Sequence, residues 1–253
     1  MKQHLTTMKH LLTLTAGLLL CGHAFAAAAE DGKHLFILSG QSNMALLNPN
    51  ISFTPTVEAA FGKENVIVVQ DAAKGKPIER WYKGWKSPEG HPPSAVGGLY
   101  NRLMESVKAA IDGKNIKTVT FVWMQGESDT KPDLSADYEA SLKGLIEQLR
   151  KDMGRQEINV VIGRLSDFQT EQENPDWMVV RKTQMAVAEA DPRGAWVDTD
   201  DCNNDVGSKS ADGKIVKDVH YTAEGFRLLG ERFANKAIEL IKKTGNPTGT
   251  IKP

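Results

Sequence analysis

The stretch 35–44, "LFILSGQSNM", passes from four apolar residues directly into a small polar cluster. The apolar run is typical of a strand that is covered on both faces. Ser42 then stands between Gln41 and Asn43, at the carboxyl end of that strand. In open α/β sheets, ligands bind at this end of the strands. The stretch therefore predicts the first strand of such a sheet, with a serine beside its ligand site.

Similar apolar runs recur along the chain and alternate with helical patterns. The apolar positions Leu99, Leu103 and Val107, for example, follow helical spacing. The alternation predicts a parallel sheet sandwiched between helices. Strands are expected at 34–39, 65–70, 117–124, 158–165 and 194–199, and helices at about 95–112, 134–152, 176–190 and 222–243.

Residues 1–26 have the features of a bacterial-style secretory signal peptide. Lys2 and Lys9 give a positive start, the apolar run that follows is too short to span a membrane comfortably, and small residues around Ala26 offer a cleavage site. We therefore expect a secreted or periplasmic protein, with no membrane insertion after the signal is removed. Cys21 leaves a lipoprotein signal as an alternative, although the residue before it is not small.

The remaining chain has the length of a single domain, over residues 30–244, followed by a polar tail at 245–253. Loss of the two signal lysines leaves 29 basic against 32 acidic residues, a formal net charge of −3. This balance gives no reason to expect a nucleic-acid partner. The one remaining cysteine, Cys202, has no partner for an internal disulfide, and its acidic neighbourhood disfavours a thiolate nucleophile. The oligomeric state stays open.

Four polar clusters lie at what should be one edge of the sheet. Three follow predicted strands ("SGQSN", "DAAKGKP" and "WMQGESD"), and "KDVHYTAEGF" precedes the last helix. Because parallel strands all end on the same side, the clusters should converge on one cleft. Ser42 needs a base to become a nucleophile, and His220 is the candidate. The amides of Ser42 and Gly75 and the side chain of Gln125 are suited to hold a developing oxyanion.

Each of these residues also has a structural alternative. Ser42 could cap the helix that follows it, and His220 could be a hydrogen-bonded histidine at the start of the last helix. Ser128 in "GESD" is a rival serine. No set of His, Cys and carboxylate residues has the usual metal-ligand spacing, so neither a metal nor another cofactor is expected.

Segment 71–93 is the chief irregular region of the chain. It carries Trp81, Tyr82 and Trp85 among glycines and prolines, a composition that suits a binding loop better than a linker. The alternative is that these aromatic side chains turn inward and fix the loop.

The motifs "GQSNM", "AKGKPIERW", "WMQGESD" and "DVHYTAEGFRLLGERFA" occur in this order over residues 34 to about 240. Together they resemble the carbohydrate esterase branch of the SGNH hydrolases, which contains acetylxylan esterases and sialate O-acetylesterase-like domains. The resemblance implies a three-layer α/β/α sandwich of the flavodoxin-like type, with a central parallel sheet of about five strands. It also implies metal-free hydrolysis of O-acetyl esters, with acetylated carbohydrate as the substrate.

The resemblance also implies a part for each motif residue. Ser42 would be the nucleophile and His220 the base. Gly75 and Gln125 would be oxyanion donors, and Gln125 stands where other SGNH hydrolases use asparagine. The residues that would organise the cleft or contact the sugar are Asn43, Trp81, Glu127 and Asp129.

The acid that would orient the histidine departs from the family pattern. The wider SGNH motif is D-x-x-H, but that position here is Lys217, and the nearest acid is Asp218, two residues before His220. Some relatives take a glutamate after the fourth strand, where "IGRLSD" here offers Arg164 and, three residues on, Asp167. Asp218 is favoured because a loop can adapt its register, and Asp167 or a serine–histidine dyad are the alternatives.

The expected function is therefore that of a secreted serine esterase that removes O-acetyl groups from acetylxylan or a related glycan through an acetyl-enzyme. A sialate O-acetylesterase and a general short-chain esterase are alternatives. A further alternative is a non-catalytic carbohydrate-binding protein with the same fold. The displaced acid supports this alternative, whereas the joint presence of the motif residues argues against it. The polar, Trp-containing loop argues against long acyl chains. The sequence does not specify the sugar.

Overall fold

The computed structural model describes residues 32–86, 96–203, 208–209, 215–216 and 218–244. Within these residues, five parallel strands form one sheet in the order β2-β1-β3-β4-β5. The predicted α/β fold with a central parallel sheet is thus confirmed. The strands are β1 (Lys33–Gly40), β2 (Val66–Ala72), β3 (Ile116–Met124), β4 (Asn159–Gly163) and β5 (Gly194–Val197).

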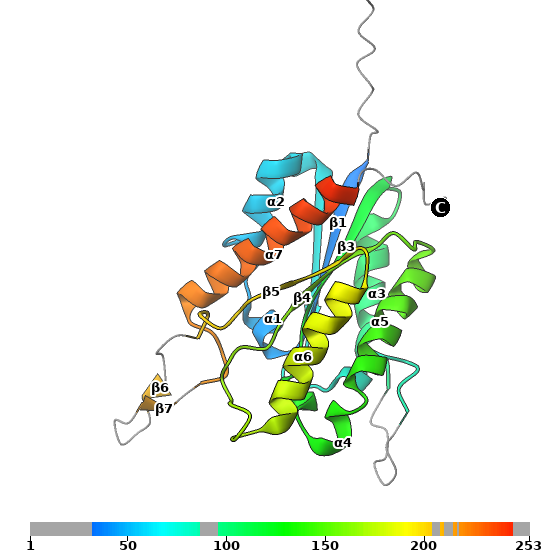
Figure 1. Cartoon of the computed structure of the whole chain (residues 1–253). Helices are drawn as coiled ribbons and strands as arrows, with labels where there is room; N and C mark the ends of the chain where they lie inside the picture. Colours follow the sequence, from blue (N-terminus) through cyan, green and yellow to red (C-terminus); the bar gives the residue numbers. More distant parts are fainter. Residues whose placement is uncertain (1–31, 87–95, 204–207, 210–214, 217, 245–253) are drawn as a thin grey trace, which may run out of the picture.

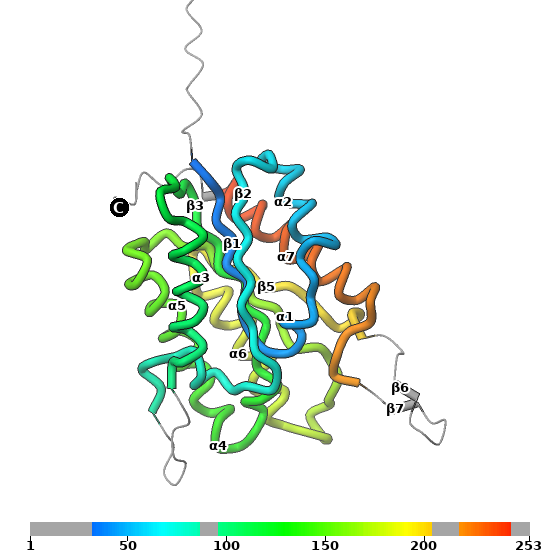
Figure 2. Tube along the Cα trace, turned by 180° about the vertical axis from the view of Figure 1, so that it is seen from behind, coloured from blue at the N-terminus to red at the C-terminus, as the bar shows by residue number. Residues whose placement is uncertain are grey.

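Helices cover both faces of the sheet (Figures 1 and 2). One face carries α1 (Ser42–Leu46), α2 (Phe53–Phe61) and α7 (Ala223–Thr244), and the other carries α3 (Gly98–Ile111), α5 (Tyr138–Met153) and α6 (Pro175–Ala190). The shorter elements are α4 (Pro132–Ser135), the 3-10 turns η1 (Lys63–Asn65), η2 (Ile78–Arg80) and η3 (Glu127–Asp129), and the antiparallel pair β6 (Ser208–Lys209) and β7 (Ile215–Val216).

The core lies between these layers. The four apolar residues 35–38 of β1 are fully buried, as expected for a central strand covered on both faces. In α3, Leu99, Leu103 and Val107 are all buried against the sheet. The helical spacing in the sequence therefore identified the inward face of this helix.

Some element boundaries differ from the expectation. The helix expected over 134–152 is divided into α4 and α5, because residues 136–137 form a turn between them. The expected helices began at about residue 95, so α2 was not among them, and a helix directly after Ser42 was considered only as the alternative in which Ser42 caps it. The segment of α1 and α2 is rich in Asn, Ser, Thr and Pro, residues that also suit turns, and it lacks a long apolar stripe. Thr222 caps α7, since its hydroxyl oxygen accepts a hydrogen bond from the Gly225 N–H at 2.8 Å.

The close pairing of β1 with β3 depends on Gly40. Its φ is +144°, and a Cβ at this position would lie 1.9 Å from the carbonyl oxygen of Met124. The next residue, Gln41, donates its backbone N–H to that same oxygen at 2.9 Å. Only glycine therefore allows the chain to leave β1 against β3 and to enter α1 at Ser42.

The predicted signal peptide, 1–26, and the tail, 245–253, lie outside the described residues. In the described part of the chain, no helix has the length and apolar character needed to cross a membrane.

His34, near the start of β1, is a buried histidine that pairs with another side chain. Its Nδ1 lies 2.7 Å from the Thr118 hydroxyl, and its ring stacks on Phe61 with centroids 4.1 Å apart. Burial, with the nearby charge of Lys117, lowers its pKa from 6.5 to about 4. The imidazole is therefore neutral in the folded protein at neutral pH.

This histidine should make the stability depend on pH. Between pH 6.5 and about 4, the unfolded chain binds a proton that native His34 does not. Its stabilising contribution is thus complete above pH 6.5 and is lost as the pH falls, by about 3 kcal/mol in total. We expect His34→Gln to lack this loss of stability at low pH. The measurement is the free energy of unfolding in urea at several pH values, for the variant and for wild type. Parallel curves for the two proteins would contradict the prediction.

Candidate active site

Ser42 is the first residue of α1, immediately after β1, and 6% of its surface is exposed. The N-cap position is held by Gln41, and no side chain caps this helix. Ser42 therefore does not have the capping role that was its structural alternative. Because the first N–H groups of a helix have no intrahelical acceptor, the Ser42 amide is free to bind an acceptor outside the helix.

Gly75 lies in the loop that follows β2, beside the first motif. The N–H of Ala73 in this loop donates to the carbonyl oxygen of Gly40 at 3.0 Å, which joins the two motif segments. Gly75 has a φ of +62°, and no atom lies within 4 Å of where its Cβ would stand. The loop is thus open at this glycine, which allows close approach by a ligand.

His220 is paired with Asp218. The imidazole Nδ1 lies 2.9 Å from Asp218 Oδ1, and the same oxygen accepts the backbone N–H of His220 at 3.0 Å. A carboxylate only accepts, so Nδ1 carries the proton and Nε2 is left for another partner. Both side chains are partly exposed, His220 by 37% and Asp218 by 40%.

The other positions considered for the acid are placed differently. Asp167 is exposed and makes no described contact with His220. Arg164 binds Asp198 and Asp200, each at 2.6 Å, so its position belongs to a network of ion pairs. The possibilities for the acid were Asp218, Asp167 and a dyad without an acid. The geometry supports Asp218, which is hydrogen-bonded to the imidazole.

Asn43 joins the serine segment to the histidine segment. Its Nδ2 donates to Glu127 Oε1 at 2.8 Å and to the carbonyl oxygen of Val219 at 3.2 Å. Asn43 directly follows Ser42, and Val219 directly precedes His220. The four motifs therefore converge on one edge of the sheet, as their order after parallel strands predicted.

Gln41 is a site residue for which sequence patterns predicted no role. It is 3% exposed, and its Oε1 accepts the backbone N–H of Ser128 at 3.1 Å and that of Gly126 at 3.4 Å. It thereby fixes the turn after β3 against the start of α1. The only sequence signal for this role was its place inside "GQSN".

Gln125 is fully buried, and its amide nitrogen is already engaged. Nε2 donates to Gln41 Oε1 at 3.2 Å and to the carbonyl oxygen of Lys76 at 3.1 Å, and it also contacts Asp129 Oδ2. An amide has two N–H groups for these three acceptors. In this arrangement Gln125 holds the second and third motifs together. To serve an oxyanion it would have to exchange one of these partners.

Asp129 is a buried carboxyl group beneath this network. It accepts the N–H of Ile78, and burial raises its pKa from 3.8 to about 7, against the opposing effect of the Gln125 amide. Because the native pKa exceeds the ordinary value, the folded state binds a proton that the unfolded state has lost. This contribution favours folding at low pH and disappears as the pH rises through about 7.

The expected sugar contact of Trp81 is wrong for this structure. Trp81 is fully buried and packs edge-to-face on Trp123, with ring centroids 5.3 Å apart. Trp85 is also buried, whereas Tyr82 is half-buried. Large aromatic side chains contribute most when they are removed from water, so these residues fix their loop from inside. Residues 87–93 of the same segment lie outside the described residues.

Cys202 is buried, and burial raises its pKa to about 12, so it stays a thiol at neutral pH. Within the described ranges, no three His, Cys, Asp or Glu side chains lie close enough together to hold a metal ion.

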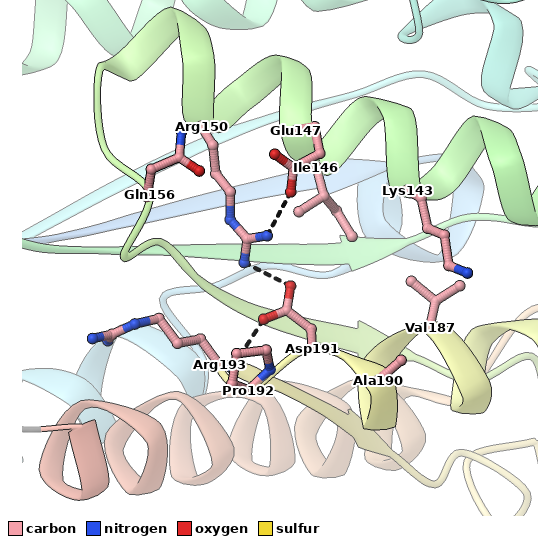
Figure 3. Close-up of a pocket in the computed structure, with 10 residues that line it drawn as sticks. All are labelled: Lys143, Ile146, Glu147, Arg150, Gln156, Val187, Ala190, Asp191, Pro192 and Arg193. Atoms are coloured by element: carbon pink, nitrogen blue, oxygen red, sulfur yellow. Dashed lines mark hydrogen bonds and ion pairs between the residues drawn. The ribbon is translucent and has the colours of Figure 1, made fainter.

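A pocket of about 390 Å³ lies away from these motifs, between α5 and α6 (Figure 3). In it, Arg150 binds Glu147 at 2.8 Å and Asp191 at 2.6 Å, so these charges are paired with one another. The pocket adjoins the amino ends of β4 and β5, opposite the edge where Ser42 lies. Its lining is Lys143, Ile146, Glu147, Arg150, Gln156, Val187, Ala190, Asp191, Pro192 and Arg193.

The α/β/α sandwich, with Ser42 after β1 and His220 before α7, is the arrangement that the resemblance to the SGNH carbohydrate esterases implied. The family model described as "Carbohydrate esterase, sialic acid-specific acetylesterase" matches residues 45–239. The chain therefore belongs to this carbohydrate esterase family and is a carboxylic ester hydrolase. The comparison with curated protein sequences found no match.

Solved structures share the fold at low sequence identity. A protein of Arabidopsis thaliana is 18% identical with a TM-score of 0.61, over 83% of this chain and 99% of that one. A carbohydrate acetylesterase from Xanthomonas citri is 16% identical with a TM-score of 0.59, over 84% of this chain and 57% of that one. Est24, a carbohydrate acetylesterase from Sinorhizobium meliloti, is 13% identical with a TM-score of 0.51, over 83% and 100%. These similarities concern the fold.

Proposed function

We propose that this protein removes O-acetyl groups from carbohydrate through an acetyl-enzyme formed on Ser42. The observation that supports the proposal is the hydrogen bond of Asn43, the residue after Ser42, to Val219, the residue before His220, together with the His220–Asp218 pair. A hydroxyl at the end of a strand, a histidine whose far nitrogen is held by a carboxylate, and free backbone amides are the parts that acyl transfer needs.

In the first half of the reaction, His220 Nε2 takes the proton of the Ser42 hydroxyl while Oγ attacks the acetyl carbonyl carbon. The carbonyl oxygen becomes an oxyanion, which the N–H groups of Ser42 and Gly75 stabilise. The tetrahedral intermediate then collapses. The bond to the sugar oxygen breaks, and the imidazolium returns its proton to that oxygen.

In the second half, water repeats these steps on the acetyl-enzyme. His220 takes a proton from the water while the water oxygen attacks the ester carbon. The bond from that carbon to Ser42 Oγ then breaks, and the imidazolium returns the proton to Oγ. Acetate leaves and the hydroxyl is restored. Asp218 stabilises the charged imidazolium at both stages.

Acetylxylan or a related acetylated glycan is the substrate that we propose. The loop that carries Gly75 also presents Lys74 and Lys76, a polar surface that suits a sugar better than a long acyl chain. The second candidate substrate is O-acetylated sialic acid, which the description of the matching family favours.

The proposal is tested by acetate release from acetylxylan, O-acetylated sialic acid and p-nitrophenyl acetate. A quenched reaction with isotope-labelled acetyl ester should also leave the label on the peptide that contains Ser42. Release from sialic acid alone would favour the second candidate. Binding of acetylated glycan without acetate release from any of the three esters would favour the non-catalytic alternative.

We further propose that the protein is exported and cleaved after Ala26. The basic start, the apolar run and the small residues before the cleavage point support this. The amino-terminal residue of the protein recovered from the medium or periplasm of the producing cells would test it. Recovery of the intact chain from the cytoplasm alone would overturn it.

A further inference from the structure

The bond between Asn43 and Glu127 leaves two buried oxygen atoms unsatisfied. Both N–H groups of Asn43 are used, one by Glu127 Oε1 at 2.8 Å and one by the carbonyl oxygen of Val219 at 3.2 Å. Asn43 Oδ1 and Glu127 Oε2 are buried and have no hydrogen-bond partner among the described residues. Buried polar atoms are nearly always paired, because an unpaired one costs about 1–3 kcal/mol.

Turning the Asn43 amide over would not solve this problem. Its oxygen would then face the Glu127 carboxyl and the Val219 carbonyl, which are both acceptors. The orientation of the amide is therefore fixed by its two partners. Each of the two remaining oxygens lacks a hydrogen-bond donor, and one donor placed between them would satisfy both.

A single proton supplies that donor. A protonated carboxyl group and a primary amide form two parallel hydrogen bonds, N–H to one carboxyl oxygen and O–H to the amide oxygen. The first of these bonds is present here, and the two unpaired oxygens are the atoms of the second. We infer that Glu127 carries a proton in the resting protein and forms a cyclic acid–amide pair with Asn43.

The charges around Glu127 agree with a neutral carboxyl group. Burial is the largest effect and raises its pKa. The effects that oppose it are, in order of size, the backbone N–H of Glu127, the hydrogen bond from Asn43, the charge of His220 and the backbone N–H of Gly126. Its other titratable neighbours are the acidic groups Asp129, Tyr138 and Tyr221, none of which supplies a positive charge. If Glu127 were ionised, protonated His220 would be its one cationic neighbour among the groups named here.

The cyclic pair makes Glu127 and Asn43 positioning residues. It holds α1, which begins with Ser42, against the turn after β3, while the second N–H of Asn43 binds the segment that carries His220. Among the described residues, the carboxyl group hydrogen-bonded to the imidazole is that of Asp218. The meaning for catalysis rests on the proposed function, whereas the proton on Glu127 does not.

The proton can be observed without any substrate. In full-length protein labelled with ¹³C at the glutamate side-chain carboxyl, the glutamate bands are shifted away from those of unlabelled Asp129. Infrared spectra at pH 7 then separate protonated from ionised glutamates. We expect one protonated glutamate band that is lost in Glu127→Gln and kept in Glu105→Gln, a matched change at an exposed residue of α3. Spectra with ionised glutamates only would overturn the inference, whether or not the protein releases acetate.

Kinetics give a second readout. Glutamine can make both bonds of the cyclic pair, and alanine can make neither. We therefore expect Glu127→Ala to lower kcat/KM about 10²-fold and Glu127→Gln to recover at least about tenfold of this loss. In Glu127→Gln, the acidic limb of the pH profile should lie at the same pH as in wild type. If Glu127 is ionised, Glu127→Gln removes a negative charge near His220 and moves that limb to lower pH. That shift would overturn the inference.

Discussion

Replacing Ser42 with alanine is expected to reduce acetate release by about 10⁴- to 10⁶-fold, to the residual rate given by substrate binding and the backbone amides alone. The reason is that no acetyl-enzyme can form without the hydroxyl oxygen. Ser42 is 6% exposed at the start of α1, so loss of one oxygen atom there leaves the fold intact. The change should therefore fall on kcat, with the melting temperature nearly constant.

The control for this experiment is Ser128→Ala, which removes the rival serine of "GESD". The described contact of Ser128 with Gln41 is made by its backbone N–H, which alanine keeps. Acetate release by this variant should stay within about threefold of wild type. Full activity in Ser42→Ala, or loss in Ser128→Ala alone, would show that the nucleophile is misassigned.

Replacing Asp218 with asparagine is expected to lower kcat by about 10²-fold. In triads where asparagine reverses the histidine tautomer, the loss is about 10⁴-fold. Here one oxygen, Asp218 Oδ1, accepts both the ring Nδ1 and the backbone N–H of His220. The backbone N–H should hold the asparagine oxygen in that place, so the tautomer persists and only the charge is lost.

Asp218→Ala removes the acceptor as well as the charge and should therefore lose about tenfold more than Asp218→Asn. The matched control is Asp167→Asn, a change of the other candidate acid, which is exposed. Steady-state rates with p-nitrophenyl acetate separate these cases. If Asp218→Asn changes kcat by less than about threefold, a different acid or a dyad orients the imidazole.

Sequence patterns predicted the sheet because its central strands, β1, β3 and β4, are buried on both faces and consist mainly of apolar residues. The run at 35–38 has no polar residue to suggest another structure, and it is fully buried. The helices with a regular apolar stripe, such as α3, were also predictable. In contrast, α1 and α2 lie in a segment of turn-forming residues, and the helical state of α2 is stabilised by its packing against α7 and β2.

Within the site, the sequence identified which residues meet but not what each of them contacts. The order of polar clusters after parallel strands was enough to bring Ser42 near His220. It was not enough to show that Trp81 turns into the core, since an aromatic residue in a polar loop suits either side. Nor did it reveal the role of Gln41, whose contacts with the backbone of the turn after β3 exist only once β1 and β3 are paired.

The two hydrogen bonds of Asn43 span 84 and 176 positions of the chain. The candidate nucleophile and its base therefore come from opposite ends of the domain, and the longer contact carries a large loop-closure cost until the intervening layers are in place. Enzymatic activity should then be among the last properties to return on refolding. For this protein, turnover is a direct report that the whole chain, and not only its sheet, has reached the native state.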